Sequence, residues 1–282
     1  MRQRLFAATT RLRDAGCDSA ALDARLLLQQ ITGLDHSGLI MQMDDLLAAS
    51  QIVTFEAMVV RRCQREPLAY IVGQRAFWNH SFHTDPRALI PRPETEHLIE
   101  AVLAHFPNHD QALQFCDVAT GSGCIAISLA LEYPQARLVA TDLSPAALAL
   151  ARENAELLGV AARVDLRCGD LFAPLTGEYF DAIISNPPYV AAQEMAALAP
   201  ELAFEPQMAL TDHDDGLTLL RRLLADAGDY LKPGGYLMVE TGSCGLPQPS
   251  ASIQLVEAIH DLAGLQRVGV YRLVNRNVSD CF

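Results

Sequence analysis

Positive charge is scarce in this sequence. Lysine and arginine together number 21 against 34 aspartates and glutamates, the formal net charge is −13, and Lys232 is the only lysine. Proteins whose main task is to bind nucleic acid usually carry a basic surface that neutralises phosphate groups. The composition therefore argues against nucleic acid as the main partner, and we expect no direct nucleic-acid binding.

Paired cysteines and long apolar runs are also missing. The seven cysteines are scattered, odd in number and include no C-x-x-C pair, so we expect neither a disulfide framework nor a metal site. No apolar run is long enough to span a bilayer. The amphipathic N-terminus, MRQRLFAATTRLRDAG, lacks the continuous apolar core of a signal peptide. The sequence therefore predicts a reduced, cytoplasmic protein with no membrane contact.

The first part of the chain has apolar residues at helical spacing, and we expect a helical N-terminal domain over residues 1–75. The segment DSAALDARLLLQQITG has cap-type residues at its start and stops at Gly33, as a helix should. A second helix is predicted from about Thr54 through FEAMVVRRCQR. Residues 76–97 are expected to form a hairpin and linker, with the turn at Asn79-His80 because asparagine tolerates positive φ.

Residues 98–282 are expected to form the second domain, in which strands and helices alternate. The predicted strands are LQFCDVA, ARLVATD, ARVDLRCGD, FDAIISNPPYV and YLMVETG, and the helices are GCIAISLALEY, SPAALALARENAELLG and DGLTLLRRLLADAGDYLKPGG. This alternation predicts the α/β class, with a mostly parallel, doubly wound sheet and helices on both faces. Ligands of such sheets bind at the carboxyl ends of the strands. The loops after Val118, Thr141, Cys168 and Ser185 are therefore expected to meet in one site.

The first of these loops, DVATGSGCIA, is rich in glycine. Glycine lets backbone N–H groups approach a ligand, and the following helix offers its positive end to an anionic group. Gly121, Gly123 and Ala126 also fit the G-x-G-x-x-G/A pattern of dinucleotide-binding proteins. Two alternatives remain open at this point. The loop is either a tight turn that binds no ligand, or part of the nucleotide site of a dehydrogenase.

The next two loops supply carboxylates. Asp142 ends the second strand, where an acidic residue accepts from two ribose hydroxyls; the alternative is a helix cap, a role that Ser144 fills better. In CGDLF, the Asp170 carboxylate is suited to an exocyclic amine, and the backbone N–H beside it, at Leu171, to a ring nitrogen. An ordinary surface turn explains Asp170 almost equally well.

The fourth loop is the run Asn186-Pro187-Pro188-Tyr189. Asparagine offers one acceptor oxygen and two donors in a plane, and the stiff proline pair holds the Pro187 carbonyl as a second acceptor. Two acceptors that converge from one strand end suit the NH₂ group of a planar molecule, and Tyr189 adds an aromatic face. These residues alone leave an amide and an exocyclic base amine equally open.

Taken together, these loops resemble class I methyltransferases that use S-adenosyl-L-methionine, with a Rossmann-like sheet. The segments REPLAYIVGQRAFW, LIPRPETE, DVATGSGCIAI, ISNPPYV, FEPQMAL and LKPGGYLMVETG follow one another over about residues 66–242. On these segments the chain is similar to the HemK/PrmC family of release-factor glutamine N5-methyltransferases. The chain departs from the family at Ala119, where glycine is more usual, and at the Asn79-His80 turn.

The resemblance implies methyl transfer from S-adenosyl-L-methionine, which leaves S-adenosyl-L-homocysteine, to the glutamine of the Gly-Gly-Gln motif in peptide chain release factors. The cofactor-binding residues it implies are Ala119, Thr120, Gly121, Ser122, Gly123, Asp142, Asp170, Leu171 and Asn186. Those for the substrate are Asn186, Pro187, Pro188 and Tyr189, of which Asn186, Pro187 and Tyr189 are expected to be catalytic. We expect the helical domain to recognise the release factor and the enzyme to act as a monomer.

Other activities share part of this pattern. An amino-methyltransferase acting on adenine in nucleic acid would use the same N-P-P-Y geometry, although the acidic composition argues against it. Another protein glutamine is an alternative substrate. An NAD-dependent dehydrogenase shares the glycine loop and Asp142 but has no need of Asn186 and its prolines.

Overall fold

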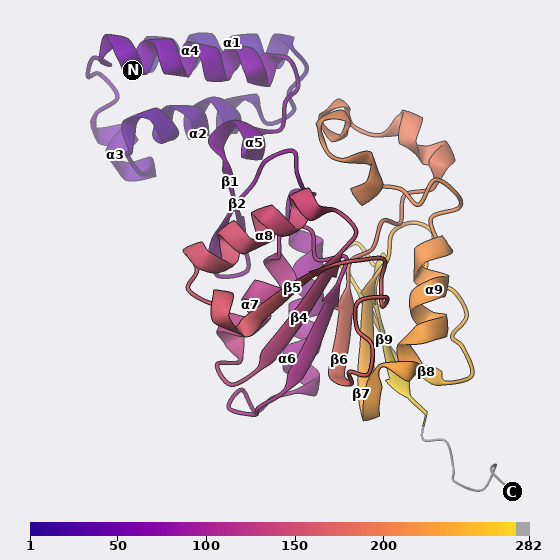
Figure 1. The fold of residues 1–282 in the computed structure, drawn as a ribbon. Coiled ribbons are helices and arrows are strands. Elements are labelled where there is room, and N and C mark those ends of the chain that lie inside the picture. Colours follow the sequence, from indigo (N-terminus) through magenta and orange to yellow (C-terminus); the bar gives the residue numbers. More distant parts are fainter. Residues whose placement is uncertain (275–282) are drawn as a thin grey trace, which may run out of the picture. The chain divides into compact units, whose positions relative to one another are not determined.

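The computed structural model describes residues 1–274, which fall into two compact units (Figure 1). The first unit comprises Met1–Gln74 together with Ala199–Phe204, and the second comprises Arg75–Leu198 and Glu205–Phe282. One of the seven cysteines for which no disulfide is expected, Cys281, lies outside the described residues. Within residues 1–274, no helix is both long and apolar enough to cross a membrane.

The first unit is built of helices around an apolar core. The helices are α1 (Arg2–Asp14), α2 (Ala20–Thr32), α3 (His36–Met41), α4 (Ala49–Cys63) and α5 (Leu68–Val72). α2 ends as predicted, because Gly33 takes the left-handed conformation that closes a helix. α4 begins five residues before the predicted Thr54. The side chain of Gln51 accepts from the backbone N–H of Ala48 at 3.0 Å and so caps its first turn.

A short segment from later in the chain, Ala199–Phe204, belongs to this helical unit. Glu201 forms ion pairs with Arg65 at 2.7 Å and with Arg62 at 3.0 Å. Arg62 is buried and also pairs with Asp23 of α2 at 2.7 Å. Burial opposes ionisation of Glu201, but hydrogen bonds from Arg65 and Arg62 outweigh it and lower its pKa to about 2. The segment is therefore anchored by charge.

The second unit contains the predicted doubly wound sheet. Its strands are β3 (Gln114–Val118), β4 (Arg137–Asp142), β5 (Val164–Cys168), β6 (Phe180–Ser185), β7 (Leu231–Glu240), β8 (Ile253–His260) and β9 (Gln266–Leu273). Their order is β5-β4-β3-β6-β7-β9-β8, parallel except for β9, which runs antiparallel to both neighbours (Figure 1). The prediction of a mostly parallel sheet is confirmed.

Helices cover both faces of this sheet, and the side chains of the central strand β6 pack against helices on each face. Ala182 and Ile184 pack into the core formed with α6 (Glu96–His105) and α7 (Cys124–Glu132), whereas Ile183 packs with α9 (Thr218–Asp226). Successive side chains of a strand point to opposite faces, so a central strand that is apolar throughout is buried on both. α8 (Pro145–Leu157) packs beside β4 and β5.

The predicted hairpin is present as β1 (Gln74–Phe77) and β2 (His80–His83), but its turn lies one residue earlier than expected. Trp78, not Asn79, has the positive φ, of 53°. Its backbone N–H donates to Glu96 at 2.8 Å and its indole N–H to Glu132 at 2.6 Å. These tertiary hydrogen bonds offset the cost of a left-handed tryptophan, which short-range turn rules do not include.

The prediction that Pro-Gly-Gly ends a helix was wrong. α9 ends at Asp226, and the 3₁₀ turn Ala227–Asp229 follows it. Residues 232–235 already belong to β7, where the pairing with β6 shifts register between Phe180 and Ala182. Proline and glycine are tolerated in a strand at such an irregularity.

Candidate active site

A pocket lies at the carboxyl ends of β3, β4, β5 and β6, where the four predicted loops meet. Residues 87–92 and Thr95 form another part of its wall. The predicted site residues that line the pocket are Ala119, Thr120, Gly121, Ser122, Asp142, Asp170, Leu171, Asn186 and Pro188. Gly123, Pro187 and Tyr189 are not among its lining residues.

The glycine loop turns sharply between β3 and α7. Ala119, Gly121 and Gly123 all have positive φ, of 61°, 55° and 83°. An alanine held in this region costs of order 1 kcal/mol, which explains why glycine suits position 119. A Cβ at position 123 would lie 2.8 Å from Ile127 and 3.1 Å from Ala151. Gly123 therefore permits α7 and α8 to approach, and it shapes the loop from outside the pocket.

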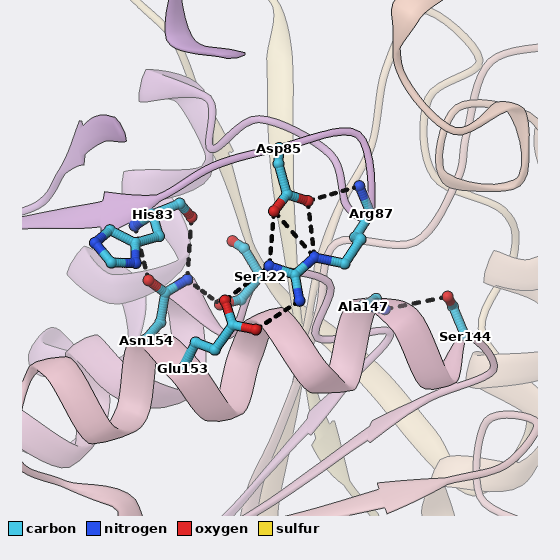
Figure 2. Close-up of polar contacts among 8 residues, drawn as sticks. All are labelled: His83, Asp85, Arg87, Ser122, Ser144, Ala147, Glu153 and Asn154. Carbon is cyan, nitrogen blue, oxygen red and sulfur yellow. Dashed lines mark hydrogen bonds and ion pairs between the residues drawn. The ribbon is translucent and has the colours of Figure 1, made fainter. Parts of the chain in front are cut away.

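Asp142 is fixed by two backbone N–H groups. Its Oδ2 accepts from Gly121 at 2.9 Å and its Oδ1 from Ser144 at 2.8 Å. Burial raises the pKa of Asp142, and the hydrogen bonds from Ser144 and Gly121 act against that rise. Each oxygen keeps a lone pair for a further donor, so the carboxylate fits the ribose diol of a nucleoside. Ser144 caps α8 as predicted, because its hydroxyl oxygen accepts from Ala147 at 3.2 Å (Figure 2).

Asp117 is a carboxylate of this site that the sequence reading did not select. It is fully buried under the glycine loop, and its Oδ2 accepts from the Thr120 hydroxyl at 2.6 Å and the Ala126 N–H at 3.1 Å. Burial raises its pKa to about 7. Its Oδ1 has no partner among the described residues, and Asp117 is not among the residues that line the pocket. The sequence feature that could have indicated Asp117 is its position as a single aspartate within an otherwise apolar strand.

Asp170 and Leu171 lie as the sequence suggested, with one addition. Asp170 is about half exposed and pairs with Arg222 of α9 at 2.7 Å, a residue that the sequence did not indicate. Leu171 has a positive φ of 47°, and its carbonyl accepts from the buried Thr141 hydroxyl at 3.1 Å. This hydrogen bond holds the backbone that borders the pocket. Recognition of an adenine ring by these two residues stays a prediction.

Asn154 of α8 ties the glycine loop to β2 (Figure 2). It is fully buried; its Oδ1 accepts from the His83 N–H at 2.7 Å, and its Nδ2 donates to the Ser122 carbonyl at 3.0 Å. Nearby, the Arg87 guanidinium binds Asp85 and Glu153, each at 2.7 Å (Figure 2). These contacts hold one wall of the pocket against α8.

Asn186 follows β6 directly and is partly exposed toward the pocket. Its Nδ2 donates to the hydroxyl of Thr95 at 3.0 Å, which leaves Oδ1 as the acceptor. Pro187 is buried. The Tyr189 hydroxyl donates to Glu240 at 2.9 Å. Thr95 and Glu240 were not selected from the sequence, because nothing in the local pattern shows that they meet Asn186 and Tyr189.

Comparison with known proteins identifies both parts of the chain. Residues 5–73 match the model of the PrmC N-terminal domain, and residues 98–213 match that of the methyltransferase small domain. The catalytic domain of hMettl16 with a MAT2A 3'UTR hairpin has a similar fold, at a TM-score of 0.53 and 14% identity over 81% of this chain and 82% of that one.

Curated relatives agree over nearly the whole length. The release factor glutamine methyltransferase of Cereibacter sphaeroides is 47% identical over 94% of this chain and 91% of its own. The release factor glutamine methyltransferase of Koribacter versatilis is 37% identical over 96% of this chain and 98% of its own. With both domain models matched and these identities spanning the whole site, the chain belongs to the family of release factor glutamine methyltransferases.

Proposed function

We propose that this enzyme transfers a methyl group from S-adenosyl-L-methionine to the side-chain nitrogen of the glutamine in the Gly-Gly-Gln motif of peptide chain release factors. The observation that carries the proposal is Asn186, which presents its amide oxygen beside the pocket bordered by the glycine loop and Asp142. We further propose that it works in the cytoplasm as a monomer, without direct contact to nucleic acid.

The pocket fits the cofactor. Asp142 would hold the ribose, and the loop from Ala119 to Ser122 would bind through its backbone N–H groups. Asp170 and Leu171, which also line the pocket, would take the adenine end. When bound, S-adenosyl-L-methionine supplies a methyl group on a sulfonium, which is strongly electrophilic.

The chain's own contribution is to orient a weak nucleophile. The nitrogen of a carboxamide is unreactive because its lone pair is delocalised into the carbonyl. Asn186 Oδ1 and the Pro187 carbonyl would accept the two amide hydrogens and direct the lone pair toward the methyl group. The same two acceptors would stabilise positive charge that develops on the nitrogen. No general base is required, because the proton can leave after transfer.

The direct test is mass spectrometry of a release factor incubated with the enzyme and S-adenosyl-L-methionine. We expect one added methyl group, located by fragmentation on the glutamine of Gly-Gly-Gln. In parallel incubations, DNA and RNA should remain unmethylated. Methylated adenine with an unmodified release factor would contradict the proposal and favour the nucleic-acid alternative.

We propose that the helical unit recognises the release factor through exposed apolar side chains near α3. Met41 and Leu46 are 85% and 96% exposed, which is unusual for residues so large and close together. Replacing both by aspartate should raise KM for the release factor about tenfold, as expected for one or two lost apolar contacts. Cofactor affinity should not change.

The matched control is Leu262→Asp, which adds charge at an exposed leucine of the other unit. We expect its KM to equal that of the wild type in the same steady-state assay. An unchanged KM for the doubly substituted helical unit would exclude this surface.

A further inference from the structure

A buried glutamate connects two segments that form the wall of the pocket. Glu205 is 4% exposed; its Oε2 accepts from the backbone N–H of Ile90 at 3.0 Å, and its Oε1 forms an ion pair with the Arg92 guanidinium. Ile90 and Arg92 line the pocket, and so does Pro206, which follows Glu205 in the chain. A buried carboxylate is costly unless it is paired and hydrogen-bonded. Glu205 meets this condition through partners that lie 115 and 113 residues earlier in the chain.

Resting on the proposed function, we propose that Glu205 is a positioning residue, which closes a ring of contacts that holds the Asn-Pro-Pro-Tyr loop at both of its ends. This loop carries Asn186, the residue that would orient the substrate nitrogen. Glu205 is not among the residues that line the pocket. Its effect on methyl transfer therefore has to pass through the residues that it holds in place.

The first half of the ring leads from Glu205 to Asn186. Glu205 binds the side chain of Arg92, and the carbonyl of Arg92 accepts from the Thr95 N–H at 3.2 Å. This hydrogen bond closes the 3₁₀ turn Pro93–Thr95. The Thr95 hydroxyl oxygen accepts in turn from Asn186 Nδ2 at 3.0 Å. Because the nitrogen of the Asn186 amide is held at Thr95, the position of Thr95 determines where the amide oxygen lies.

The second half of the ring follows the chain from Glu205 to the other end of the loop. A 3₁₀ turn over Gln207–Ala209 leads to Leu210, whose carbonyl accepts from the Val190 N–H at 2.9 Å. Val190 comes directly after the last residue of the Asn-Pro-Pro-Tyr loop, and it also forms a parallel bridge with Thr211. The segment that begins at Glu205 therefore holds the second end of the loop.

Proline stiffens the ring between these contacts. Each of its three segments contains proline, namely Pro91 and Pro93, Pro187 and Pro188, and Pro206. Proline fixes its own φ and keeps the preceding residue extended, and Arg92 is extended, with φ −100° and ψ 143°. Segments of this kind bend little, so a contact at Glu205 governs the position of groups several residues away. Without that contact the two wall segments are free to separate, and the Asn186 amide is displaced with one of them.

The direct test compares Glu205→Gln with the wild type, with a release factor as substrate. Glutamine keeps the size of the side chain, but the Ile90 N–H and the Arg92 guanidinium are both donors and the new NH₂ group is a third. Whichever way the amide lies, one donor faces another. We expect kcat to fall about 10- to 100-fold, the scale for reacting groups displaced by about 1 Å. Calorimetric affinity for S-adenosyl-L-methionine should fall much less, and an unchanged kcat would overturn the positioning role.

Arg92 allows the same contact to be tested from its other partner. Arg92→Gln removes the ion pair at a side chain that is 30% exposed, so it tests the ring even if Glu205→Gln does not fold. Arg92→Lys keeps a cation for Glu205 and should recover most of kcat. The double variant Arg92→Gln/Glu205→Gln should be no slower than the slower single variant, because both substitutions break one contact. Additive losses, or equal losses with lysine and glutamine, would overturn the proposal.

Amide hydrogen exchange measured by NMR separates positioning from a general loss of stability, and it needs no release factor. In Glu205→Gln, the N–H groups of Thr95 and Val190, which close the two halves of the ring, should exchange faster than in the wild type. The N–H of Leu148, which donates to the Ser144 carbonyl at the start of α8, should keep its rate. Equal acceleration at all three would show that Glu205 only stabilises the fold.

The matched control is Glu178→Gln, which removes the ion pair of another glutamate, at 3.0 Å from Arg167, in the same unit and outside the pocket. Its kcat should equal that of the wild type. A wild type that leaves the release factor unmethylated would contradict the proposed function, and the exchange rates would then decide on the ring alone. Equal turnover of the wild type and Glu205→Gln would contradict only the role of Glu205.

Discussion

Replacing Asn186 by alanine should lower kcat on the release factor about 100- to 1000-fold, the usual effect of removing one preorganised polar group from a transition state. The substituted enzyme loses the acceptor that orients the substrate nitrogen. It also leaves the Thr95 hydroxyl without the donor it binds at 3.0 Å. Single-turnover methyl transfer to the release factor, at saturating cofactor, measures the effect directly.

Affinity for the cofactor should fall much less than kcat in this variant, since Asp142 and the glycine loop are untouched. Asn108→Ala, at an exposed asparagine of the same unit, is the matched control and should keep full turnover. Asn186→Asp is informative as well, because it keeps an acceptor oxygen but has no N–H for Thr95; we expect it to lose turnover too. Near-normal kcat in Asn186→Ala would refute the mechanism of amide orientation.

Replacing Asp142 by alanine should instead weaken cofactor binding, by at least about 100-fold in Kd. A hydrogen bond to a charged group contributes about 1.5–3 kcal/mol, and the ribose diol would lose two. The substitution also removes the acceptors of Gly121 and Ser144, which loosens the entrance to the pocket. Asp142→Asn keeps one acceptor and should lose about tenfold. Calorimetric titration with S-adenosyl-L-homocysteine is the appropriate measurement.

The exposed Asp110 provides a control, because Asp110→Ala removes a carboxylate of the same unit that lies outside the pocket. Its Kd should equal that of the wild type. NAD titrated into the wild type should not bind, and binding of NAD in place of S-adenosyl-L-homocysteine would support the dehydrogenase alternative. Asp142→Ala with unchanged affinity would remove Asp142 from the cofactor site.

The features that could be predicted from the sequence depend on local physics. Gly33 ends a helix because its own φ is positive. Ser144 caps another helix because its hydroxyl accepts from the backbone N–H three residues later. The strands that alternate with helices are apolar throughout, so they have to be buried on both faces. This pattern was enough to predict the sheet and the edge of the sheet at which its loops meet. Asp142 and Asn186 could be predicted to lie at one pocket because strand ends in such a sheet converge.

The remaining features depend on contacts between residues far apart in the chain. Trp78 adopts its turn because of Glu96 and Glu132, and neither is part of the hairpin. Thr95 and Asn186 are 91 residues apart, and folding alone brings their side chains within hydrogen-bond distance. Gly-rich and Pro-rich runs are ambiguous for a similar reason, since residues 232–235 have the composition of a helix stop but lie within β7, at the shift in its register with β6.

The discontinuous helical unit has a consequence for protein engineering. Because Ala199–Phe204 belongs to that unit while its flanks belong to the other, the polypeptide passes from one unit to the other at three places. A chimaera made by exchanging only the first 74 residues would separate Glu201 from Arg62 and Arg65, its cationic partners. An exchange of substrate specificity between relatives therefore needs both segments transplanted together, and evolution of the two has to proceed in concert.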